Sequence, residues 1–148
     1  MRAFTLIEIL IIIGMVAVLA SASFLGLAGF RTSQDLKSAT RTLVAVLRDV
    51  QSRSMSQEDD KFWGLRVSQP TKEAAVFQGS SCAYATETSK TKLKNSLEFR
   101  VPASGNLDIC FEKISGYSSA GSDVTITIGV VGDVNERTIT IYKNGRIE

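Results

Sequence analysis

A long run without a charged residue near the N-terminus constrains this chain more than any other feature. It covers residues 9–30, and most of its side chains are apolar. Roughly 22 residues at about 1.5 Å each would form a helix of roughly 33 Å, enough to cross a hydrocarbon core of about 30 Å. We therefore predict a helix that crosses a membrane or lies in a similarly apolar environment.

One acidic residue, Glu8, directly precedes this run. A carboxylate in a membrane-spanning segment costs up to about 2.5–3.5 kcal/mol on insertion scales, and less near the interface. This cost predicts that Glu8 has a partner of opposite charge.

The motif Phe4-Thr5-Leu6-Ile7-Glu8, followed by an apolar stretch, resembles the N-terminus of type IV pilins and type II secretion pseudopilins. In that family a prepilin peptidase cleaves before the Phe and N-methylates it, and the acid pairs with the new amino terminus during filament assembly. The resemblance implies cleavage between Ala3 and Phe4, methylation of Phe4, and an assembly role for Glu8. It also implies three partners: other pilin-like subunits, the prepilin peptidase/methyltransferase and an inner-membrane assembly platform.

Two features depart from the family pattern, and two other interpretations stay open. The residue before the cleavage site is Ala3 where the family usually has Gly, and the leader, residues 1–3, is unusually short. A secretory signal peptide could instead be cleaved after residues 20–22, although its apolar core would be long. A plain single-span anchor would leave Glu8 unexplained.

After residue 30 the composition becomes polar, but the helical period continues. Apolar positions recur at three- and four-residue steps: Leu36, Ala39 or Thr40, Leu43, Leu47 and Val50. No Pro or Gly interrupts residues 31–63, so we expect the helix to end near residue 54 or 56. Joined to the apolar run it would make one helix of about 50 residues and 75 Å. Alternatively, Ser33 could cap a separate helix.

From residue 61 onward the pattern is that of β-strands. Alternating and short apolar runs predict strands at residues 62–67, 74–78, 97–101, 107–111, 124–128 and 138–142. The last two are predicted to form a hairpin. Residues 80–95 are rich in Ser, Thr and Lys, which predicts a loop.

These elements predict an α+β fold, in which a long N-terminal helix packs on a mostly antiparallel β-sheet head. The helix has a membrane half and an amphipathic half, as in pilins. The predicted divisions are a leader peptide (1–3), a transmembrane or filament-core helix (4–30), an amphipathic helix continuing into the head (31–56) and a β-rich periplasmic head (57–148). With its closing Gly-Arg segment, this plan resembles the H-type minor pseudopilins of type II secretion and their type IV pilus counterparts, together the GspH/FimT family.

The C-terminus does not favour a nucleic-acid partner. In some competence-linked members of the family a terminal Gly-Arg-x-Arg contacts DNA, whereas residues 145–148 of this chain read Gly-Arg-Ile-Glu. Glu148 and the terminal carboxylate would repel phosphate. The only short basic run, Lys90, Lys92 and Lys94, is better explained as a solvated loop.

The two cysteines, Cys82 and Cys110, predict a disulfide. Their separation is no metal-ligand spacing, and an even pair in a domain exported across a membrane is typical of an oxidising compartment. Two buried free thiols are the alternative. The chain has no His, so imidazole metal ligation and His-based acid–base chemistry are absent. No metal site and no cofactor are predicted.

No set of residues in the sequence has the pattern of an active site. The acidic run 58–60 is interpreted as a solvated boundary, residues 132–136 as a hairpin turn, and the Phe62-Trp63 pair as part of the core. We therefore predict a structural subunit and no enzyme.

The function predicted is that of a minor pseudopilin in a type II secretion filament, assisting its assembly and initiation for protein export across the outer membrane. The alternative is a type IV pilus minor pilin, with a role in pilus biogenesis, adhesion, motility or DNA uptake. Either protein would be a single-pass protein of the bacterial inner membrane, with its head in the periplasm until it enters a filament.

Overall fold

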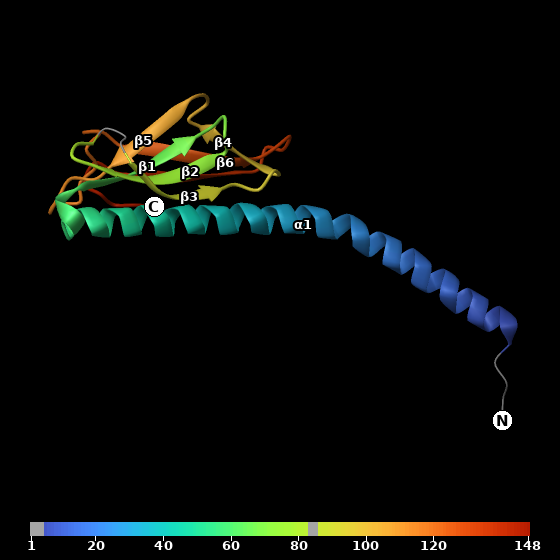
Figure 1. Ribbon diagram of the computed structural model, residues 1–148. Coiled ribbons are helices and arrows are strands. Elements are labelled where there is room, and N and C mark those ends of the chain that lie inside the picture. The colour runs from blue at the N-terminus through green and yellow to red at the C-terminus, as the bar shows by residue number, and fades with distance from the viewer. Residues whose placement is uncertain (1–4, 83–85) are drawn as a thin grey trace. The chain divides into compact units, whose positions relative to one another are not determined.

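The computed structural model describes residues 5–82 and 86–148, except for the side chains of residues 22–28. The chain divides into two compact units, Met1–Gln34 and Asp35–Glu148. Figure 1 shows the elements in order: α1 (Leu6–Met55), η1 (Glu58–Asp60), β1 (Phe62–Ser68), β2 (Glu73–Gly79), β3 (Thr86–Lys92), β4 (Leu97–Val101), β5 (Asn106–Cys110), β6 (Val124–Val130) and β7 (Glu136–Ile141).

The predicted long helix is confirmed. α1 is a single helix of 50 residues, and Ser33 does not begin a new one. It ends close to the predicted position because Gln57 adopts the left-handed conformation, with φ 55°, which turns the chain out of the helix. Arg53 lies in the last turn, where a cation interacts favourably with the carboxyl end of the helix dipole.

The strands of the second unit form two antiparallel sheets. One sheet has the order β3-β2-β1-β5 and the other β4-β6-β7. The predicted terminal hairpin is confirmed. β6 and β7 pair with each other, and Ile126 of β6 lies opposite Ile139 of β7. Two further pairings join strands that are distant in sequence, β1 with β5 and β4 with β6.

A hydrophobic core holds the helix and the two sheets of the second unit together. The helix contributes one face, Leu36, Leu43, Leu47 and Val50, as its spacing predicts. Both sheets contribute their inward strand positions, among them Leu65, Val76, Phe99, Ile109, Ile126 and Ile139. In Figure 1 the strands of this unit all lie on one side of the helix. Burying each such side chain stabilises the fold by about 1.5–3 kcal/mol.

The prediction of a loop over residues 80–95 is wrong in its middle part, because residues 86–92 form strand β3. This strand pairs with β2 at the edge of the larger sheet, with Val76 opposite Ser89. Most of its side chains are exposed, and neither face of the strand is apolar. Its backbone pairing alone defines it as a strand, so no alternation of apolar and polar residues revealed it.

Candidate functional site

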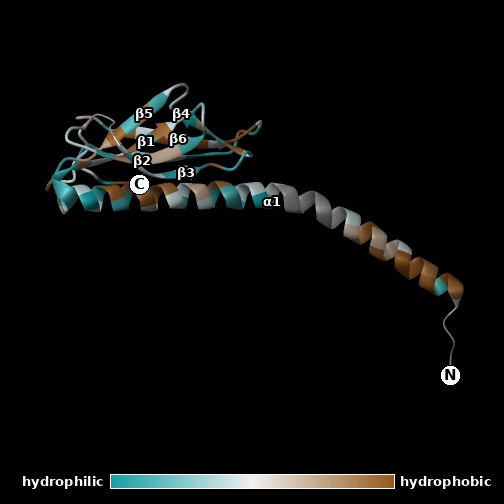
Figure 2. Cartoon of the chain, viewed as in Figure 1, coloured by the Kyte–Doolittle hydropathy of each residue, from teal (hydrophilic) through white to brown (hydrophobic). Residues whose placement is uncertain are grey.

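The helical part of the first unit exposes apolar side chains on all sides. Leu6 is 82% exposed and Leu19 is 69% exposed, and the large apolar side chains between them are all at least half exposed. Figure 2 shows these first turns of α1 mostly in the hydrophobic colour, and a mixture of colours in its last turns. A helix that is apolar all round is stable only in lipid or among other helices.

Among the described residues, no helical stretch combines the length and the apolar character that crossing a bilayer requires.

Glu8 is the one charged side chain of this exposed segment. It lies in the first turn of α1, and its amide donates to the carbonyl of Thr5 at 3.1 Å. Its side chain is exposed, and none of the described residues forms an ion pair with it. An acid in the first turn interacts favourably with the helix dipole, but most of its capacity to bind a cation remains available. The predicted cleavage and methylation sites, Ala3 and Phe4, lie outside the described residues.

The predicted disulfide is present in the head. Cys82 and Cys110 are bonded, with an S–S distance of 2.02 Å and a Cα–Cα distance of 5.7 Å. Cys110 ends β5 and Cys82 follows β2, and β1 lies between these two strands in the sheet. The bond therefore ties the β2–β3 connection to the opposite edge of the sheet.

Gly64 and Phe77 form a small packing contact in the same sheet, next to Cys110. Gly64 of β1 is opposite Phe77 on one side and Cys110 on the other. A Cβ atom on Gly64 would lie 2.3 Å from Phe77 Cζ, so only glycine lets the ring lie over the strand. Phe77 is fully buried although it points away from the main core.

The C-terminal segment is held within the head. Ile147 forms a bridge with Ile141, and Gln51 of α1 donates to the carbonyls of Gly116 and Gly145, both at 2.8 Å. Residues 142–145 form a tight turn, in which the Gly145 amide donates to the Tyr142 carbonyl at 2.8 Å.

The side chain of Arg146 is engaged inside the chain. Its guanidinium lies 4.1 Å from the centre of the Tyr142 ring, and its Nε is 3.3 Å from Glu148 Oε1. The residue that replaces the second Arg of the DNA-binding motif is therefore the ion-pair partner of the first.

The acidic run 58–60 forms η1, just after α1, and its residues are exposed, as predicted. Trp63 is buried in the core, and Ser54 bonds with both its amide and its carbonyl. The Lys113 ammonium donates to the Asp60 carboxylate at 2.7 Å. This hydrogen bond, together with the charge of Lys113, lowers the pKa of Asp60 below its ordinary value.

The β6–β7 turn explains the oxygen-rich residues 132–136 without a metal. Asp133 accepts hydrogen bonds from the Asn135 side chain at 2.8 Å and from the Val134 amide at 2.6 Å. The bonds from Asn135 and then Val134 lower the pKa of Asp133. Arg100 donates to the Asp133 carbonyl and to the Val130 carbonyl, which fixes the turn.

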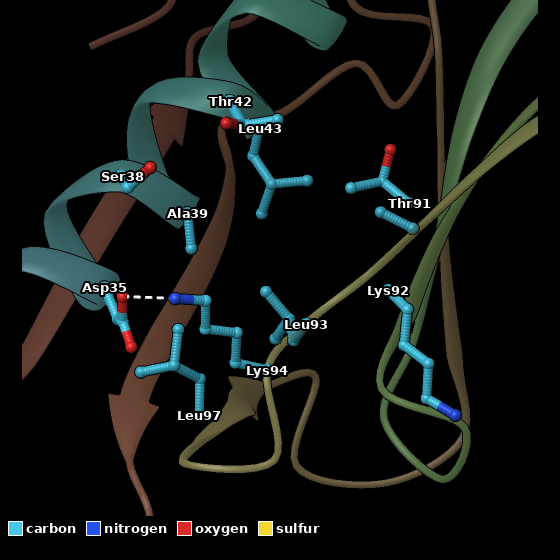
Figure 3. A pocket seen from close by; sticks show the side chains of 11 residues that line it. Asp35, Ser38, Ala39, Thr42, Leu43, Thr91, Lys92, Leu93, Lys94 and Leu97 are labelled. Atoms are coloured by element: carbon cyan, nitrogen blue, oxygen red, sulfur yellow. Dashed lines mark hydrogen bonds and ion pairs between the residues drawn. The ribbon is translucent and has the colours of Figure 1, made fainter. Parts of the chain in front are cut away.

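A small cavity of about 170 Å³ lies between α1 and residues 91–97 (Figure 3). Its lining is largely apolar, and an ion pair between Asp35 and Lys94, 2.5 Å long, lies at its edge. Ser38 and Thr42 are the hydroxyl groups that α1 contributes.

Two solved structures have a similar fold. The structure of the minor pseudopilin EpsH from the type 2 secretion system of Vibrio cholerae superposes with a TM-score of 0.59 at 16% sequence identity, covering 77% of this chain and 94% of that chain. A crystal structure of the minor pseudopilin EpsH from the same system gives a TM-score of 0.59 at 15% identity, covering 78% and 92%. This chain has the fold of a minor pseudopilin.

The predicted α+β, pilin-like architecture is therefore confirmed, as is the resemblance to the H-type pseudopilins at the level of the fold. No protein-family model matches the sequence, and comparison with curated proteins gives no match.

Proposed function

We propose that this chain is a structural subunit of the minor pseudopilin type, which enters a type II secretion filament and assists its assembly. The observation that carries the proposal is the all-round exposure of apolar side chains along the first turns of α1, in a chain whose head has the minor pseudopilin fold. A subunit of this kind is a structural protein, and it performs no reaction of its own.

The exposed segment supplies the driving force for assembly. Each large apolar side chain transferred from water to an apolar environment contributes about 1.5–3 kcal/mol. Before assembly that environment is the bacterial inner membrane, with the head in the periplasm. In the filament it is the bundle of helices from neighbouring subunits. The same side chains therefore serve both states.

Glu8 supplies register in this proposal. A purely apolar helix can slide along its partners, because apolar packing is not directional. Cleavage before Phe4 would create a positive amine one helical turn from Glu8. At an effective dielectric of about 20, two unit charges 4 Å apart attract by about 4 kcal/mol before desolvation is subtracted. Pairing of Glu8 with the amine of a neighbouring subunit would fix the offset between the two helices.

The two similar structures favour the type II secretion function over the type IV pilus alternative, because both come from a type II secretion system. The partners that the proposal requires are other pilin-like subunits, the prepilin peptidase and the inner-membrane assembly platform.

Mass spectrometry of the N-terminus of the mature chain tests the proposal. We expect a methylated Phe4, and accumulation of uncut precursor for Ala3→Leu but not for Ala3→Gly, because the peptidase must fit the residue before the cut closely. A mature chain that starts at Ser23 would instead identify a signal peptide and overturn the proposal.

A further inference from the structure

Three cations lie close together on the exposed face of α1 in the second unit. Lys37, Arg41 and Arg48 are all exposed. At 3.6 residues per turn their positions lie within about 40° of one another around the helix axis. Apolar Leu43 and Leu47 are on the other side of the helix, in the core. We name these three cations the basic stripe.

The two acids of this part of the helix already have partners, although Asp49 is exposed as well. Asp35 pairs with Lys94 of the β3–β4 connection, and Asp49 pairs with Arg53 in the next turn. Among the described residues, none forms an ion pair with a member of the basic stripe. Solvated helix faces usually mix charges of both signs. In addition, Lys37 and Arg41 are like charges at i, i+4, which destabilises a helix slightly.

We propose that the basic stripe is a docking surface for an acidic strip on a neighbouring pilin-like subunit. This inference rests on the proposed function, and it adds a second electrostatic contact, in the head, to the one assigned to Glu8. Charge complementarity across an interface selects partners and fixes their relative position.

The length of the stripe favours a protein over a lipid surface. From Lys37 to Arg48 the helix rises about 16 Å. Charges more than about 8–10 Å from a membrane surface are largely screened at physiological salt. A partner that meets all three cations must therefore extend along the helix, as a neighbouring subunit does.

The chemistry of the face also suits close approach by another chain. The exposed residue that lies between Arg41 and Arg48 near the same face is Ala45, and its small side chain leaves space for a partner. In Figure 1 the strands of this unit lie on one side of α1, and the three cations of the stripe are exposed.

Zero-length crosslinking of assembled filaments that contain the full-length chain tests the inference. A carbodiimide joins an amine to a carboxylate only when the two are in contact. We expect Lys37 to be linked to an Asp or Glu of a pilin-like subunit, identified by mass spectrometry of the joined peptides. Lys37→Arg keeps the charge but cannot be joined in this way, so it should lose the link and still assemble.

A pair of matched variants measures the contribution of the stripe. The triple variant Lys37→Gln, Arg41→Gln, Arg48→Gln removes three charges from the stripe. The control Lys61→Gln, Arg137→Gln, Lys143→Gln removes three charges elsewhere on the head. Exposed ion pairs are individually weak, so we expect the stripe variant to lower filament incorporation at least about fivefold and the control to change it less than about twofold. Added salt should lower wild-type incorporation more than that of the stripe variant.

The outcomes separate the inference from the function on which it rests. Equal incorporation of the wild type and the stripe variant would overturn the basic stripe alone. A Lys37 link only to a second copy of this chain, or to a protein that is not pilin-like, would also overturn it. If the wild-type chain enters no filament at all, the proposed function fails together with the inference.

Discussion

Removing the disulfide should destabilise the head by several kcal/mol. Cys82 and Cys110 are separated by 28 residues, and loop-closure entropy for a loop of this size gives about 3–4 kcal/mol. For a domain of about 115 residues this corresponds to a fall in Tm of roughly 12–16 °C. The effect should be near this full value, because Cys110 is held independently at the end of β5, where its carbonyl accepts hydrogen bonds from the amide and hydroxyl of Ser119.

The measurement is a thermal and urea unfolding curve of the full-length chain in detergent, with and without reductant. The double variant Cys82→Ala, Cys110→Ala should match the reduced wild type, and reductant should leave the variant unchanged. The free energy of unfolding of the double variant should also depend slightly more steeply on urea concentration than that of the oxidised wild type, since the unfolded variant is less compact. A loss of less than about 1 kcal/mol would refute the entropic reasoning.

Two further predictions concern the head. Gly145→Ala should lower the free energy of unfolding, measured in urea, by about 1–3 kcal/mol. The reason is that Gly145 has a φ of 81° and that a Cβ atom there would lie 2.2 Å from the Gly116 carbonyl oxygen. An unchanged free energy of unfolding would contradict this close approach. Lys113→Met should raise the pKa of Asp60 toward 3.8, followed by NMR titration of its side chain. Since this pKa is lowered in the folded state, its stabilising contribution is present above the ordinary pKa and is lost as the pH falls through the folded value. Wild type and variant should therefore differ in the electrostatic part of their stability at neutral pH and converge in acid, and an unchanged pKa would contradict the pairing.

Much of the fold follows from local patterns in the sequence. The spacing of Leu36, Leu43, Leu47 and Val50 places them on one helical face, and these residues form the helical part of the core. The strands with apolar positions on an inward face were also predictable, because each has a buried side chain that the main core requires. The assignment of the Phe62-Trp63 pair to the core is correct for Trp63, whereas Phe62, at the start of β1, is only partly buried.

The features that the sequence did not reveal depend on distant pairing. β3 is an edge strand without an apolar face, so its partner β2 defines it and its own residues do not. The division into two sheets arises because β5 returns to β1, while β4 pairs with β6. Neither choice leaves a signal within one strand. The Cys82–Cys110 bond was predictable from composition, but its position across the edge strands was not.

The same contrast holds for the residues that we propose to act in filament assembly. The exposed apolar segment and Glu8 are evident from the sequence, since one acid beside an uncharged run is rare. The basic stripe is not evident, because Asp35 and Asp49 flank its three residues along the chain. The structure pairs those two acids with Lys94 and Arg53, so among the described residues they do not pair with the three cations of the stripe.

Filament incorporation of a Glu8 variant tests the central proposal most directly. Glu8→Val should leave the thermal unfolding of the head unchanged, because the side chain has no ion-pair partner among the described residues and lies in the other compact unit. Crosslinking of the variant to neighbouring pilin-like subunits should be strongly reduced relative to wild type. Asp59→Asn, which removes another exposed acid, serves as the control and should assemble normally. Normal incorporation of Glu8→Val beside its neighbours would contradict the assembly role of Glu8, and with it the proposal that this carboxylate sets the register of the helix in the filament.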